Sequence, residues 1–278
     1  MNMDDREVGR YWNENAAEWT RGVRAGWDVY RRFMHDPAFY RLLPPLAGQK
    51  VLDLGCGEGL SSRQLADMGA TVVGIDVSDA MIVAAREHEK AEPHGIVFHT
   101  ASGSAMETLT DASFDAVVSV MALMDLSDYP ACTKEVARVL KPGGLFQFSI
   151  LHPCVHTPVF QWVTTADGRA GLAIGNYFGL DPLQPQDKVD QWHWSNAPPE
   201  AHAAERPMRV PRFWRTVSEY LNVLLENGFV LSHVAEPYAD SSAAAKWRGL
   251  DKTRYVPWVL IVQCHKLPIS NGVKESAL

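Results

Sequence analysis

Three glycines and one aspartate carry the clearest chemical signal in the sequence. Gly55, Gly57 and Gly59 stand at alternate positions of VLDLGCGEG (51–59), between an apolar run and a helical pattern. Glycine has no Cβ, so this main chain can approach a ligand closely, and the following helix points its free N–H groups at the same place. Asp76 ends the next apolar run, where a carboxylate can accept hydrogen bonds from both hydroxyls of a ribose. The pattern predicts a loop that binds a nucleoside-containing cofactor.

Both features also have plainer explanations. A glycine-rich turn after a strand can serve the chain topology alone, and an aspartate after a strand can cap a helix. Ser78 and Asp79 are better placed than Asp76 to cap the helical pattern that follows. We therefore assign Asp76 to the ligand rather than to the cap.

Two side chains are candidates for moving a proton. His152 follows an apolar run, and histidine titrates near neutral pH, so it could take a proton from a hydroxyl or an ammonium group. Asp125 is the alternative acid or base, against a structural role at the entry of a helix. A metal site built from His152, Cys154 and His156 is disfavoured, because a proline interrupts any helical face and no further ligand lies nearby.

The segments that position these residues alternate between short apolar runs and amphipathic stretches, which indicates β-α units and a parallel sheet. The pattern predicts strands at 51–54, 71–75, 96–99, 114–121, 145–151, 229–235 and 257–265, and helices at 60–68, 79–88, 131–140 and 216–227. The polar stretch 249–255 between the last two strands is too short for a crossover helix, so these strands should pair antiparallel. We expect an α/β fold on a mostly parallel sheet.

The distribution of tryptophan divides the chain into segments. Three tryptophans precede residue 30 and four lie between 151 and 216, whereas none occurs between 46 and 150. We predict an N-terminal helical lid (1–45), a cofactor-binding core (46–150) and an inserted substrate-binding cap (151–216). A segment that completes the core (217–267) and a flexible tail (268–278) should follow.

The composition limits the function classes. The 278 residues are 46% hydrophobic and 21% charged, and no apolar run is long enough for a membrane span. The net charge of −7 argues against a nucleic-acid binder, which needs clustered Lys and Arg. The polar start carries no targeting pattern, and the four cysteines show no C-x-x-C spacing. We predict a cytoplasmic protein without a metal, a nucleic-acid partner or a membrane partner, and a homo-oligomer is compatible with the sequence.

At the glycine loop the chain resembles class I S-adenosylmethionine-dependent methyltransferases, in particular small-molecule enzymes of the ubiquinone-type group. Its G-x-G-x-G spacing differs from the G-x-G-x-x-G of most dehydrogenases, and FDAVV (114–118) and VLKPGG (139–144) also match the family. The resemblance implies S-adenosylmethionine as cofactor, S-adenosylhomocysteine as product, and a Rossmann-like sheet of order 3-2-1-4-5-7-6 with strand seven antiparallel. Ligands should bind at the carboxyl ends of strands one and four, where the strand order switches.

The resemblance also implies residues around the cofactor. The expected contacts are Trp12, Trp19, Asp53, Gly55, Cys56, Gly57, Gly59, Asp76, Val77, Met81, Ser104, Ala105, Met106 and Met121. The family loop after strand three often offers an aspartate to the adenine amino group, whereas this chain has Ser104 there, or Glu107 if the alignment shifts. Tyr11, Trp12 and Trp19 would form a lid over the sulfonium, because aromatic faces attract cations, with Tyr11 also a catalytic candidate. The alternative is a helix that packs these rings on the sheet.

The inserted segment should shape the acceptor site. We predict that Trp162, Tyr177, Trp192, Trp194, Arg212 and Trp214 surround a bulky methyl acceptor, while some of them form the core of the cap. The predicted reaction moves a methyl group to a nitrogen or oxygen of a small molecule, in antibiotic or other secondary metabolism. The alternatives are an NAD-type oxidoreductase and a non-catalytic nucleoside-binding protein.

Overall fold

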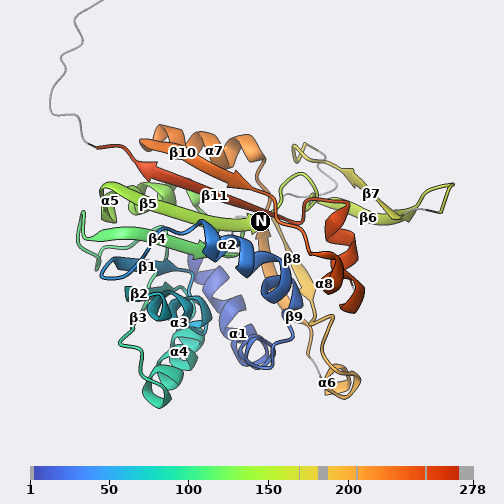
Figure 1. The fold of residues 1–278 in the computed structure, drawn as a ribbon, viewed down its shortest axis with the longest axis horizontal. Coiled ribbons are helices and arrows are strands. Elements are labelled where there is room, and N and C mark those ends of the chain that lie inside the picture. Colours follow the sequence, from blue (N-terminus) through green and yellow to red (C-terminus); the bar gives the residue numbers. More distant parts are fainter. Residues whose placement is uncertain (1–2, 169, 181–186, 205, 248, 269–278) are drawn as a thin grey trace, which may run out of the picture.

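The computed structural model describes residues 3–268 apart from 169, 181–186, 205 and 248. Its centre is a seven-stranded sheet (Figure 1) of order β10-β11-β5-β4-β1-β2-β3. The strands are β1 (Lys50–Leu54), β2 (Thr71–Asp76), β3 (Val97–Thr100), β4 (Phe114–Val120), β5 (Leu140–Leu151), β10 (Phe229–Ala235) and β11 (Val259–Lys266). Strands β1 to β5 run parallel, and β11 is antiparallel to β5 and β10. The predicted Rossmann-like strand order and its reversed strand are confirmed.

Strand β1 shows why the sequence forms this sheet. Its apolar residues Val51, Leu52 and Leu54 are no more than 2% exposed, because helices cover both faces of a central parallel strand. Val51 pairs with Val72 of β2 on one side and with Ala116 of β4 on the other. After β1 the chain continues to β2 and β3 on one side of β1, and it then returns to form β4 on the other side. This switch in strand order leaves a crevice for a ligand at the carboxyl ends of β1 and β4.

The helices of the core lie within three residues of their predicted bounds. They are α3 (Leu60–Asp67), α4 (Asp79–Ala91), α5 (Tyr129–Val139) and α7 (Val217–Glu226). Ser78 begins α4, because its Oγ accepts a hydrogen bond from Met81 N at 3.2 Å. Thr216 and Glu219 form a capping box at the start of α7. Local capping chemistry therefore sets where these helices begin.

The N-terminal segment is helical and lies across the carboxyl edge of the sheet. It comprises α1 (Asp5–Arg24), a π-helical turn η1 (Arg31–His35) and α2 (Asp36–Leu42). Asn13 Oδ1 accepts hydrogen bonds from Ser78 Oγ at 2.7 Å and from Ala80 N at 3.0 Å. An added Cβ at Gly9 would lie 3.1 Å from Val77 O, so α1 passes close to the end of β2.

The described residues of the segment 151–216, which we predicted to be a cap, form two hairpins. Strand β6 (Val159–Thr164) pairs with β7 (Ala170–Gly175), and β8 (Asp187–Trp192) pairs with β9 (Met208–Phe213), with α6 (Pro199–Ala204) between the last two. The β8–β9 hairpin packs along α1, where Asn15 Nδ2 donates to Arg209 O at 2.8 Å and Asn15 Oδ1 accepts from Arg209 N at 3.1 Å. The β6–β7 hairpin projects from the body of the molecule (Figure 1). The two parts of the insertion therefore have different surroundings.

The connection between β10 and β11 holds more structure than its polar sequence indicated. It contains α8 (Ser241–Lys246) and the 3-10 helix η3 (Leu250–Arg254). Neither carries the chain across the sheet, because β10 and β11 are adjacent and antiparallel, as we predicted.

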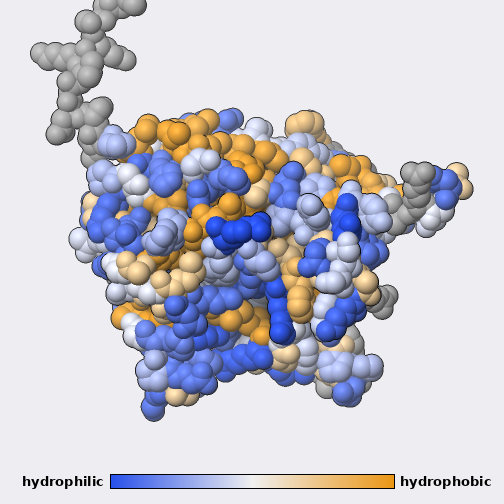
Figure 2. All heavy atoms as spheres, in the orientation of Figure 1, coloured by the Kyte–Doolittle hydropathy of each residue, from blue (hydrophilic) through white to orange (hydrophobic). Residues whose placement is uncertain are grey.

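Apolar side chains reach the surface at one edge of the sheet. Figure 2 shows apolar surface over α7 and β10, where Leu225, Val230 and Val234 are about half exposed. Within the described part of the chain, no helix combines the length and the apolar character that crossing a membrane requires. The predicted flexible tail, apart from residue 268, lies outside the described residues.

Gly22 allows α1 to pack on the β8–β9 hairpin, because an added Cβ there would lie 2.1 Å from the ring of the buried Trp194. We expect Gly22→Ala to lower the free energy of unfolding by ~1–3 kcal/mol through the displaced ring. This loss should appear although alanine favours a helix over glycine by about 1 kcal/mol. Urea denaturation followed by circular dichroism measures it, and a gain in stability would contradict the close contact.

Candidate active site

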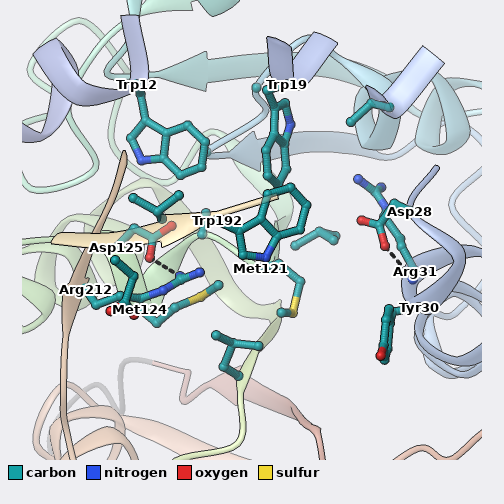
Figure 3. A pocket seen from close by; sticks show the side chains of 18 of the residues that line it. Trp12, Trp19, Asp28, Tyr30, Arg31, Met121, Met124, Asp125, Trp192 and Arg212 are labelled. Carbon is teal, nitrogen blue, oxygen red and sulfur yellow. Dashed lines mark hydrogen bonds and ion pairs between the residues drawn. The ribbon is translucent and has the colours of Figure 1, made fainter. Parts of the chain in front are cut away.

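A cavity of about 560 Å³ lies at the carboxyl ends of β1 and β4. Its walls come from the glycine loop after β1, the end of β2, the turn η2 (Leu123–Asp125) after β4, helix α1 and the β8–β9 hairpin. Figure 3 shows Trp12 and Trp19 on one side, Trp192 beside them, and the Asp125–Arg212 pair below. The cavity therefore occupies the place where this strand order favours a ligand.

The glycine loop presents its main chain to the cavity. Gly55, Gly57 and Gly59 have φ angles of +73°, +54° and +90°, a region that favours glycine. An added Cβ at Gly55 would lie 2.4 Å from Ala122, whereas one at Gly57 would meet no atom within 4 Å. The main chain at Gly57 thus borders open space that ligand atoms can fill. Gly59 begins α3 and does not line the cavity.

Asp76 ends β2 beside this loop. Its Oδ2 accepts a hydrogen bond from Gly57 N at 2.8 Å, and its Oδ1 accepts one from Ser78 N at 2.9 Å. Burial raises the pKa of Asp76, against the lowering effect of these two N–H groups. Each carboxylate oxygen can accept a further hydrogen bond, and Asp76, Val77 and Met81 all line the cavity. The Asp76 carboxylate can therefore accept hydrogen bonds from a ribose diol, and the ribose contact itself stays a prediction.

Asp53 does not reach the cavity. Its side chain is fully buried, and its Oδ2 accepts a hydrogen bond from Ser62 Oγ at 2.6 Å. Burial raises the pKa of Asp53 to about 6, and its Oδ1 has no hydrogen-bond partner among the described residues. We therefore place Asp53 under the glycine loop, bonded to α3, rather than against the cofactor.

The loop after β3 meets the cavity at different residues from those predicted. Ala101 and Gly103 line the cavity, whereas Ser104, Ala105 and Met106 do not. Ala105 N donates to Ser102 O at 3.2 Å, and this tight turn directs the chain away, so that Met106 has no exposed surface and joins the core. Glu107, the other candidate for the adenine amino group, is exposed to solvent.

Met121 and Cys56, which we predicted to contact the cofactor, both line the cavity. Met121 has a φ of +55°, which is unusual for a residue with a side chain, and its N–H donates to Ser149 O at 3.0 Å. Backbone strain of this kind is often found at functional sites. The turn from β4 into η2 is therefore held in a costly conformation at the cavity wall.

Four tryptophans form one wall. Trp12 and Trp19 meet edge to face with ring centroids 5.2 Å apart, and Trp19 lies 5.4 Å from Trp192 and 5.1 Å from Trp194. All four line the cavity. Tyr11 does not, because it precedes Trp12 on the helix and so lies on another face, where its hydroxyl accepts a hydrogen bond from Arg209 Nη2 at 3.1 Å.

The structure does not bring His152 to the cavity. His152 Nε2 lies 2.8 Å from Glu236 Oε1, and its Nδ1 accepts a hydrogen bond from Cys154 N at 3.1 Å. Burial lowers the pKa of His152, although Glu236 acts to raise it. With both ring nitrogens engaged, His152 holds the loop after β5 in shape, and the structure argues against it as the base.

Asp125 is better placed than His152 to move a proton. It forms an ion pair with Arg212 of β9 at the cavity wall, and both side chains are mostly buried. Burial raises the pKa of Asp125 to about 6, against the lowering effect of Arg212. A carboxylate with this pKa is largely ionised at pH 7 and can accept a proton.

The predicted acceptor residues divide into two groups. Trp192, Trp194, Arg212 and Trp214 line the cavity. Trp162 instead stacks on Trp258 with ring centroids 6.2 Å apart, and Tyr177 accepts a hydrogen bond from Val217 N at 2.9 Å. Neither lines the cavity: Trp162 belongs to β6 of the projecting hairpin, and Tyr177 follows β7.

Several residues at the cavity were missed by the sequence analysis. Asp28, Arg31, His156 and Trp258 line it, although His156 had been considered only as a metal ligand. Burial lowers the pKa of His156 to about 3, and its Nε2 has no hydrogen-bond partner among the described residues. No motif marks these positions, because only the docking of the N-terminal helices and β11 brings them together.

Comparisons with known proteins agree with this geometry. A family model described as "Methyltransferase domain" matches residues 52–148. A ubiquinone biosynthesis O-methyltransferase from Azorhizobium caulinodans is 36% identical over 190 residues, 58% of this chain and 73% of its own length. One from Thiobacillus denitrificans is 32% identical over 158 residues, 54% of this chain and 65% of its length. The chain thus spans less than two thirds of the latter protein.

A solved structure is similar over more of the chain. An S-adenosylmethionine-dependent methyltransferase from Mesorhizobium loti is 29% identical with a TM-score of 0.67, and the match covers 83% of this chain and 96% of that one. The strand order, the glycine loop and the relatives lead to one assignment. The chain belongs to the class I S-adenosylmethionine-dependent methyltransferase family, whose cofactor is S-adenosylmethionine.

Proposed function

We propose that this chain methylates a hydroxyl oxygen of a bulky, largely apolar small molecule, with S-adenosylmethionine as the methyl donor. The observation that carries the proposal is the continuity of one cavity. It joins the open main chain at Gly57 and the carboxylate of Asp76 to the tryptophan wall and the Asp125–Arg212 pair. A donor site and an acceptor site therefore share one cavity, which brings the two reactants together as group transfer requires.

The residues at the glycine loop fit the cofactor. Gly57 leaves space for the amino-acid portion against the main chain, and Asp76 offers two acceptor oxygens to the ribose. The faces of Trp12 and Trp19 attract a cation. When bound, the cofactor supplies a methyl group on positively charged sulfur; the new carbon–oxygen bond forms as the carbon–sulfur bond breaks, and the electron pair stays on sulfur.

The chain's own contribution to the chemistry is to hold the acceptor and to take its proton. We infer that Asp125 accepts the hydroxyl proton and that Arg212 keeps the carboxylate ionised and oriented through their ion pair. The tryptophan wall excludes water, which strengthens the electrostatic effect of both groups. Transfer to oxygen is favoured over nitrogen by the names of the similar O-methyltransferases.

Two observations bear on the biological role of the reaction. The similar proteins are named for ubiquinone biosynthesis, and the large aromatic insertion is the basis for proposing antibiotic or other secondary metabolism. We keep the secondary-metabolite acceptor, the cytoplasmic location and a homo-oligomer as proposals. Radiolabelled methyl transfer to a panel of hydroxylated and aminated aromatic compounds would separate oxygen from nitrogen acceptors.

We expect Asp76→Ala to weaken binding of S-adenosylhomocysteine by more than tenfold, because two hydrogen bonds to a charged acceptor are lost. Isothermal titration calorimetry measures this. Asp79→Ala is the matched control, since it removes a carboxylate three residues further along that does not line the cavity. Unchanged affinity in Asp76→Ala would refute the ribose contact, and binding of NAD in place of S-adenosylhomocysteine would favour an oxidoreductase.

We expect Asp125→Asn to lower kcat by roughly 10²–10⁴-fold while leaving affinity for S-adenosylhomocysteine unchanged, because the amide cannot accept the proton. In the unaltered protein, kcat should fall as the pH drops below about 6, since Asp125 is then protonated. Asp128→Asn is the control, because asparagine preserves its helix cap. A pH–rate profile that is the same in Asp125→Asn and the unaltered protein would rule out Asp125 as the base.

A further inference from the structure

The first turn of α1 makes an unusual set of contacts outside the cavity. The carboxylate of Asp5 accepts hydrogen bonds from the hydroxyls of Ser102, Ser104 and Ser127. Two of these serines lie in the loop after β3, and the third lies in the loop after β4. One side chain of α1 therefore binds two loops that are far apart in the sequence.

These three segments are walls of the same cavity. Helix α1 contributes Val8 and Trp12, one and two turns beyond Asp5, and the loop after β3 contributes Ala101 and Gly103. The loop after β4 contributes Met124, Asp125 and Leu126, immediately before Ser127. The carboxylate of Asp5 thus sits where the cofactor wall, the lid helix and the acceptor wall meet.

The chemistry of the contact favours a charged carboxylate. Burial acts to raise the pKa of Asp5, and the three serine hydrogen bonds lower it below the usual value. The side chain also lies in the first turn of α1, where the helix dipole stabilises a negative charge. Ser104 N donates to Ser102 Oγ at 3.1 Å, which occupies a lone pair of that hydroxyl and leaves its proton for Asp5.

We propose that Asp5 is a positioning residue for cofactor binding, which closes α1 over the cavity by joining it to the loops after β3 and β4. This inference rests on the proposed function, because it treats the cavity as the cofactor site. Among the described residues, the other hydrogen bonds that side chains of α1 make to the core, through Asn13 to the turn after β2 and through Arg24 to Glu58 and Ala84, lie further along the helix. Asp5 therefore supplies the polar contact at the N-terminal end of the helix, beside the apolar packing of Val8.

The test compares two adjacent carboxylates of the same helix end. Asp5→Ala and Asp5→Asn should each weaken S-adenosylhomocysteine binding by about tenfold in calorimetry. In these variants α1 is no longer held against the loops after β3 and β4, so binding must also order the helix. Asp4→Asn is the matched control: Asp4 caps α1 through Glu7 N and contacts neither loop, and asparagine keeps the cap, so the affinity of this variant should stay within about twofold of that of the unaltered protein.

A second measurement separates positioning from a merely structural role. In the unaltered protein, S-adenosylhomocysteine should slow hydrogen–deuterium exchange in the first two turns of α1, and this protection should be lost in Asp5→Asn and in Ser127→Ala. Ser127→Ala also keeps the test usable if the Asp5 variants fold poorly. Equal affinities in all variants, or equal losses in Asp4→Asn and Asp5→Asn, would overturn the inference. Failure of the unaltered protein to bind S-adenosylhomocysteine would instead overturn the proposed function.

Discussion

The junction between the ends of β1 and β2 is the constraint on which the glycine-loop side of the cavity depends. Three successive N–H groups of the glycine loop donate to the end of β2: Gly55 and Cys56 to Ile75 O at 2.9 Å each, and Gly57 to Asp76 Oδ2 at 2.8 Å. These bonds hold the loop in a conformation with positive φ angles. They also set the position of the carboxylate, so the loop and the acid form one rigid unit.

The tryptophan side of the cavity is held by aromatic packing rather than by main-chain hydrogen bonds. Its walls are aromatic rings from α1, the β8–β9 hairpin and the start of β11, and their close contacts leave little freedom to any one ring. The Asp125–Arg212 ion pair places charge in this largely aromatic wall, with Asp190 nearby. Because the surroundings are poorly polarisable, the charge acts strongly on any group beside it. The cavity thus combines broad apolar contact with a few charged side chains.

Patterns of local chemistry predicted much of this molecule. The alternation of apolar runs and amphipathic stretches indicated the sheet, and a strand followed by three glycines indicated the loop, since both depend on neighbouring residues alone. The direction of a side chain that leaves the end of a strand depends on the contacts of the next turn. His152 and Asp125 both follow strands, yet Glu236 holds the first away from the cavity and Arg212 holds the second at its wall.

The sequence by itself determined the strands of the core, the glycine loop and the acid at the end of β2, because these follow from periodicity, backbone freedom and motif spacing. The strand order was implied by the resemblance to the family. Tertiary structure alone decided which aromatic residues line the cavity. Trp12 faces it and Tyr11 does not, and this depends on how α1 docks across the sheet. It also joined Asp5 to three distant serines, since contacts between segments so far apart form only when the chain is folded.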